Sequence, residues 1–112
     1  MQLLFFVLNK VECLEDILEE FGEAGIYGAT ILESTGMAHS LSEFSDLSFM
    51  LSLRMLLNPG HKESRTIMMV ISEEKIKTVS EIINRVTGGL DQPDSGVLFT
   101  VPVAYMEGFG EQ

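Results

Sequence analysis

Two stretches of the chain share one order of hydrophobic patterns, in which a strand pattern is followed by a helix pattern and a second strand pattern. Residues 3–8 (LLFFVL) are apolar at every position, which is typical of a buried strand. Apolar residues then recur at helical spacing over residues 14–21, with glutamates between them. Residues 27–34 (YGATILES) show enough alternation to predict a second strand. This part of the chain therefore predicts one strand–helix–strand unit.

The same order returns in the second half of the chain. Residues 65–72 (RTIMMVIS) predict a strand, and Ser72 at its end can cap a helix. The apolar positions of that helix span residues 76–86, and the glycines that follow them favour a helix end. Residues 96–103 (GVLFTVPV) predict the fourth strand.

Two such units with right-handed crossovers interleave into a single sheet. The predicted fold class is α+β, with a ferredoxin-like βαββαβ order. It consists of a four-stranded antiparallel sheet with two helices on one face. At 112 residues the chain is long enough for one core, so residues 1–112 are expected to form one domain.

The predicted strands are apolar on both of their faces, whereas two helices can cover only one face of the sheet. The uncovered face would be a larger apolar patch than soluble monomers usually expose. We therefore expect the chain to associate with itself through this face. The alternative is that the segment between the second and third strands folds over it.

That segment, residues 37–64, is an insert of 28 residues, too long for a simple loop in a compact domain. A capping-box spacing at residues 40–43 and the Asn-Pro-Gly stop at 58–60 predict a helix at about 42–57. The helix either packs on its own domain or docks a partner, and both interpretations stay open. Its predicted docking surface consists of Phe44, Leu47, Met50, Leu51 and Met55.

Composition and charge exclude several classes of partner. The net charge is −10 with only seven Lys and Arg, which argues against nucleic acid and against an anionic membrane surface. No apolar segment approaches the roughly 20 residues of a membrane-spanning helix. The start of the chain has no signal-peptide pattern, and the single cysteine excludes an internal disulfide, so a cytoplasmic location is expected.

Enzyme chemistry has little support in the sequence. His39 and His61 both lie in the insert, without the spacing of a metal cluster. Cys13 starts an acidic helix, where neighbouring carboxylates raise the pKa of its thiol. We expect neither an enzyme nor a metal site.

Residues 25–36 (GIYGATILESTG), the long insert, residues 66–89 and residues 95–103 (SGVLFTVPV) together resemble the PII signal-transduction proteins. The resemblance covers most of the chain and is specific in the order and spacing of its glycine turns. It implies a homotrimer in which the open sheet faces pack inward. It also implies adenine nucleotide or another small effector in clefts between subunits, and a role in nitrogen regulation. The insert 37–64 would be the T-loop counterpart, which contacts a protein partner such as a transporter or an enzyme.

The resemblance also implies a set of ligand-binding positions. They are Thr35, Gly36, Ala38, Lys62, Arg65, Thr87, Gly88 and Gly89. The chain departs from the family where a loop lysine is replaced by Val97, and residues 104–112 contain no base. Asp91 and Asp94 would repel a triphosphate unless Lys62, Arg65 or a metal ion compensated its charge.

Three hypotheses follow. The first is a PII-like regulatory trimer that binds a small ligand and docks a partner through residues 42–57. The second is an oligomeric interaction module without a ligand. The third is a CutA-like metal-binding trimer or a small enzyme in the same cleft, which the long insert disfavours because CutA-type proteins have a shorter connection there.

Overall fold

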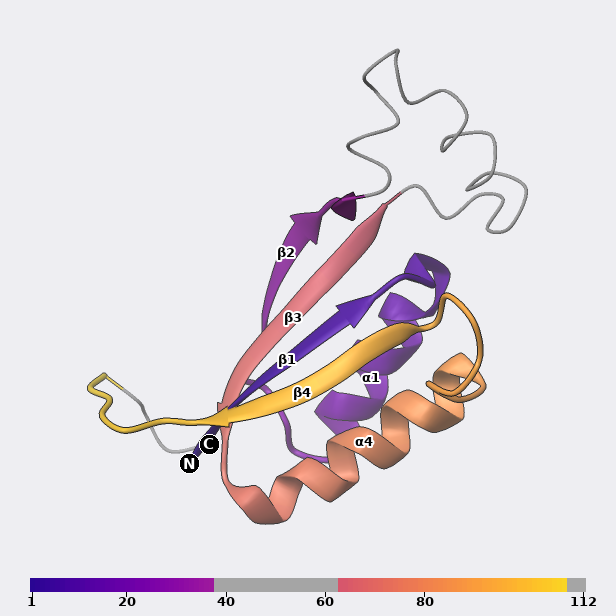
Figure 1. Cartoon of the computed structure of the whole chain (residues 1–112). Coiled ribbons are helices and arrows are strands. Elements are labelled where there is room, and N and C mark those ends of the chain that lie inside the picture. The colour runs from indigo at the N-terminus through magenta and orange to yellow at the C-terminus, as the bar shows by residue number, and fades with distance from the viewer. Residues whose placement is uncertain (38–62, 109–112) are drawn as a thin grey trace.

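The structure is a computed structural model that describes residues 1–37 and 63–108. Its elements, in chain order, are β1 (Gln2–Leu8), the 3-10 turn η1 (Val11–Cys13), α1 (Leu14–Glu23), β2 (Thr30–Ser34), β3 (Ser64–Ile71), α4 (Glu73–Thr87) and β4 (Gly96–Pro102). The four strands form one sheet, and both helices lie on the same face of it (Figure 1).

The strands lie in the order β2-β3-β1-β4, and every neighbouring pair is antiparallel. Each strand–helix–strand unit therefore crosses over one strand of the other unit. The predicted α+β class, with a four-stranded antiparallel sheet and two helices, is confirmed. The arrangement is compatible with the ferredoxin-like fold. The predicted insert helix at 42–57 lies outside the described residues.

The second strand is shorter than the sequence predicts. It begins at Thr30 rather than at residue 27, and its pairing with β3 starts at Thr30 opposite Met68. Gly25 has a positive φ of 80°, so the chain turns sharply after α1 and joins the sheet only later. At the other helix the prediction of a glycine stop is confirmed, because Gly88 follows α4 with a left-handed φ of 88°.

The core lies between the sheet and the two helices. Alternate residues of the central strands β1 and β3 point into it, and the apolar stripes of α1 and α4 cover them. Its largest fully buried members include Phe6, Phe21, Leu4, Leu8, Ile17, Ile67, Ile83 and Val79. The apolar stripes predicted for the two helices are therefore the faces that pack against the sheet.

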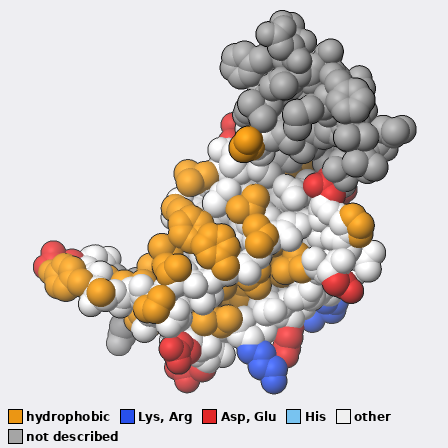
Figure 2. Space-filling view, in the orientation of Figure 1, with side chains coloured by type: hydrophobic (Ala, Val, Ile, Leu, Met, Phe, Trp, Pro, Cys, Tyr) orange, Lys and Arg blue, Asp and Glu red, His pale blue; other side chains and the backbone are white. Residues whose placement is uncertain are grey.

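The opposite face of the sheet carries a second set of apolar side chains, which we call the open-face cluster. Strand register assigns to it Leu3, Phe5, Val7, Met68, Val70, Val97, Phe99 and Val101. Phe5 and Phe99 stack across β1 and β4, with ring centroids 5.2 Å apart. Val97 and Phe99 are 53% and 46% exposed, and Figure 2 shows apolar side chains gathered over the sheet. Among the described residues, nothing covers the open face of the edge strand β4.

Candidate functional site

The described candidate ligand positions lie at one end of the sheet. Strand register places Glu33, Arg65, Leu8 and Gly96 in a single row across β2, β3, β1 and β4. The segments just beyond this row are the end of β2, the start of β3 and the loop at residues 88–95 between α4 and β4 (Figure 1). The fold therefore gathers these segments at one end, as the interleaved topology requires.

The same topology keeps two parts of the predicted site apart within one protomer. Thr35 and Gly36 follow β2, whereas Thr87, Gly88 and Gly89 precede β4. β2 and β4 are the two edge strands, separated by β3 and β1, so roughly 14 Å of sheet lies between them. Ala38 and Lys62 lie outside the described residues, as does the whole predicted docking surface on 42–57.

Arg65 lies between these two parts, on β3. Its guanidinium donates to the Glu63 carboxylate at 3.3 Å and to the Ser64 carbonyl at 3.0 Å. Both partners are neighbours in sequence, so the side chain stays at the start of β3. A ligand that bound Arg65 would have to compete with the Glu63 carboxylate.

Three hydroxyl groups join the ends of β2 and β3 on the face that carries the open-face cluster. Ser34 Oγ and Ser64 Oγ are 2.7 Å apart, and Thr66 Oγ1 donates to Ser34 Oγ at 2.9 Å. Ser64 is buried at 4% exposure. This hydrogen-bonded group fixes the point from which Thr35 and Gly36 leave the sheet.

The loop after α4 is hydrogen-bonded to the last turns of that helix. Thr87 Oγ1 donates to the Ile83 carbonyl at 2.7 Å and accepts from the Gly89 N–H at 3.4 Å. The Leu90 N–H donates to Asn84 Oδ1 at 2.8 Å. Because these N–H groups already have partners in the protein, an anion that used them would have to displace those bonds.

Lys10 supplies a cation at this loop that the sequence analysis did not assign. Its ammonium donates to the Thr87 carbonyl at 2.9 Å, at the C-terminal end of α4. A positive charge there stabilises the helix end and one of its unpaired carbonyls. Only the strand order could have indicated this contact, because Lys10 follows β1 and β1 lies beside β4.

Replacing Lys10 with methionine is expected to lower the free energy of unfolding by about 1 kcal/mol, because the contact is a charged hydrogen bond to a half-buried carbonyl. Chemical denaturation measures the change. The matched control is Lys77→Met on the exposed side of α4. Equal stability of the two variants would contradict a structural role for the Lys10 contact.

The end of the loop is held closely against β1. The Ser95 carbonyl accepts from the Asn9 N–H at 3.1 Å, and Ser95 is only 1% exposed. Gly96 has a φ of 150°, and a Cβ added there would lie 2.3 Å from the Val7 carbonyl oxygen. Only glycine therefore fits at the entry to β4.

Cys13 is half-buried beside α4, and its thiol donates to the Val86 carbonyl at 3.7 Å. Burial raises the pKa of this thiol, and the nearby Glu12 carboxylate raises it further. The rise predicted from the acidic neighbours therefore has burial as its larger cause. A thiol of this kind is a poor nucleophile at neutral pH.

Residues 1–37 and 63–108 contain neither a candidate membrane span nor a candidate metal cluster. No helix in these ranges is both long and apolar enough to span a bilayer. No group of three or more His, Cys, Asp or Glu in the same ranges is placed to hold a metal ion.

Comparison of the chain with models of known protein families and with curated protein sequences found no match.

Proposed function

We propose that this chain is a cytoplasmic, PII-like regulatory protein with a ferredoxin-like fold. In this proposal it assembles as a homotrimer, binds a small effector between subunits and docks a protein partner through its insert. The proposal rests on the resemblance in sequence and on the geometry described above.

The observation that carries the proposal is the open-face cluster. Val97, Phe99 and Val101 lie on the edge strand β4 with at least 40% of each side chain exposed. An apolar surface of this kind favours association, because burying it removes contact with water. Packing of the same sheet face from three subunits would bury the cluster at the centre of the assembly, which supports a closed symmetric oligomer.

The separation of the candidate ligand positions also supports an assembly. Thr35 and Gly36 lie beyond one edge strand, and Thr87 to Gly89 lie before the other. In an oligomer in which the edges of neighbouring subunits meet, the first group of one subunit can face the second group of the next. A cleft between subunits would then combine positions that one protomer keeps apart.

The charges at this end of the sheet favour an effector of limited charge. Lys10 and Arg65 are the described cations here, and both already contact protein groups. Asp91 and Asp94 add negative charge here, in the loop at 88–95 between α4 and β4. We propose an adenine nucleotide or another small effector, with a metal ion or a neighbouring subunit supplying the further positive charge that a polyphosphate requires.

The partner would bind the insert through the predicted docking surface on residues 42–57. Deleting 42–57 is expected to abolish binding of the partner while leaving the assembly intact, since the open-face cluster lies on the strands. Light scattering of the deletion variant measures its mass. Dissociation of the deleted protein would contradict the docking role and indicate that the segment belongs to the core.

A second candidate function is an oligomeric interaction module without a ligand. The hydrogen bonds donated by N–H groups of the loop at 88–95 favour it, because they occupy groups that an anion would need. This candidate keeps the trimer and the docking insert, and differs only in the absence of an effector.

A thermal-shift panel distinguishes the two candidates. The purified protein is heated with ATP, ADP, AMP, cyclic nucleotides and divalent metal ions. A ligand at a hundred times its Kd stabilises the folded state by about 2.7 kcal/mol, which raises the melting temperature clearly. A rise supports the effector-binding protein, whereas no shift at saturating concentrations supports the interaction module.

A further inference from the structure

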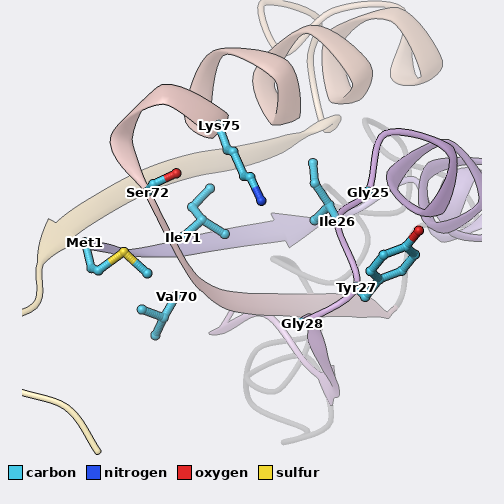
Figure 3. A pocket seen from close by; sticks show the side chains of 9 residues that line it. All are labelled: Met1, Gly25, Ile26, Tyr27, Gly28, Val70, Ile71, Ser72 and Lys75. Atoms are coloured by element: carbon cyan, nitrogen blue, oxygen red, sulfur yellow. The ribbon is translucent and has the colours of Figure 1, made fainter. Parts of the chain in front are cut away.

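A cavity of about 180 Å³ lies at the end of the sheet opposite to the candidate site. It is enclosed by the chain segment that follows α1, by the end of β3 and by the first turn of α4 (Figure 3). Its walls include the apolar side chains of Ile26, Val70 and Ile71.

The cavity exists because β2 stops pairing before β3 ends. Thr30, the first residue of β2, pairs with Met68, whereas β3 continues past Met68 to Ile71. Residues 25–28, which precede β2, have not yet joined the sheet, since Gly25 turns the chain after α1 with a positive φ. The edge of β3 therefore borders an empty space where a longer β2 would lie.

The polar side chains that line this space are Tyr27, Ser72 and Lys75, and the last two come from the start of α4. Ser72 precedes the helix, but its hydroxyl makes no capping hydrogen bond. Lys75 is half-buried, and its side chain points from α4 towards the cavity (Figure 3). Among the described residues, no hydrogen bond or ion pair of the Lys75 ammonium is found, and no carboxylate side chain lines the cavity.

We propose that this cavity binds a small organic monoanion, a carboxylate attached to an apolar or aromatic body. The apolar walls would hold the body, and the Lys75 ammonium would donate to the carboxylate. The volume is suitable, because an apolar cavity of about 150 Å³ accommodates benzene. The Lys75 ammonium compensates a single negative charge, which favours a carboxylate over a di- or triphosphate.

This site is independent of the proposed function. It lies within one protomer, at the end of the sheet where β1 begins, whereas the proposed effector cleft lies where β1 ends. Failure of carboxylate binding would leave the assembly and the effector cleft untouched, and failure of the trimer would leave this cavity in place.

The test is a titration of the full chain with benzoate, with benzamide as a neutral molecule of the same shape. Isothermal calorimetry gives the Kd, and methyl NMR spectra report which side chains sense the ligand. We expect saturable benzoate binding that shifts the methyl signals of Ile26, Val70 and Ile71, and benzamide binding at least tenfold weaker.

Two variants test the role of the ammonium. Lys75→Met keeps the aliphatic length and removes the charge, so benzoate should bind at least tenfold more weakly than to the wild type. Lys77→Met is the matched control, because Lys77 lies on the same helix, is exposed and does not line the cavity. Its Kd for benzoate should equal that of the wild type.

Several results would overturn the proposal. Benzoate binding that does not saturate, or that shifts only signals elsewhere in the protein, would exclude the cavity as the site. Equal affinity for benzoate and benzamide, or an unchanged Kd in a folded Lys75→Met variant, would exclude recognition of the negative charge. A Lys75→Met variant that fails to fold leaves the benzamide comparison and the NMR shifts of the wild type to decide.

Discussion

Replacing Phe99 with glutamate is expected to convert the assembled protein into monomers. Phe99 stacks on Phe5 within the open-face cluster and is 46% exposed in the protomer. In the proposed trimer the side chain at this position is buried against other subunits. A carboxylate buried there without a partner costs several kcal/mol, so each contact between subunits should weaken by about a hundredfold or more.

Light scattering coupled to size-exclusion chromatography measures the mass of the variant. Two controls accompany it. Phe99→Leu keeps an apolar side chain and should keep the assembly, and Thr78→Glu adds a carboxylate on the exposed surface of α4 and should also keep it. If Phe99→Glu stays assembled while folded, the open-face cluster is not the interface.

Replacing Gly96 with alanine is expected to destabilise the fold by about 3 kcal/mol or more. The φ of 150° at Gly96 is strained for any residue with a Cβ, which costs about 1–3 kcal/mol. The added Cβ would also lie 2.3 Å from the Val7 carbonyl oxygen. This oxygen is backbone of the central strand, and it cannot move away without disturbing the pairing of Leu8 with Gly96.

Urea denaturation at a fixed protein concentration measures the loss, which corresponds to a fall of about 2 M in the midpoint if the m-value is about 1.5 kcal/mol/M. The matched control is Gly22→Ala within α1, where an added Cβ meets nothing within 4 Å. That change should stabilise the protein by about 0.5–1 kcal/mol, because alanine favours the helix. An unchanged midpoint for Gly96→Ala would show that the entry to β4 is not constrained as described.

The strands and helices were largely predictable because their hydrophobic periods are unambiguous. The strand predicted at residues 3–8 starts one residue later than β1, and the apolar stripe predicted at 76–86 lies within α4. The start of β2 was predicted three residues too early, since an apolar Tyr27 continues the pattern although Gly25 has already turned the chain. Periodicity reports which residues could pair, whereas the turn decides where pairing begins.

The candidate site was less predictable, because its geometry depends on which strands are neighbours. The contact of Lys10 with Thr87 joins residues 77 positions apart and requires β1 to lie beside β4. The cavity at Lys75 arises from the early end of one strand pair, which no local pattern signals. The need for glycine at position 96 follows from a close approach to Val7, which sequence spacing does not reveal.

We propose that the chain works as a homotrimer assembled through the open face of its sheet. The mass of the purified wild-type protein, measured by light scattering over a range of concentrations, tests it most directly. The proposed homotrimer should have three times the 12.4 kDa of one chain. A mass of one or two chains at every concentration would contradict it.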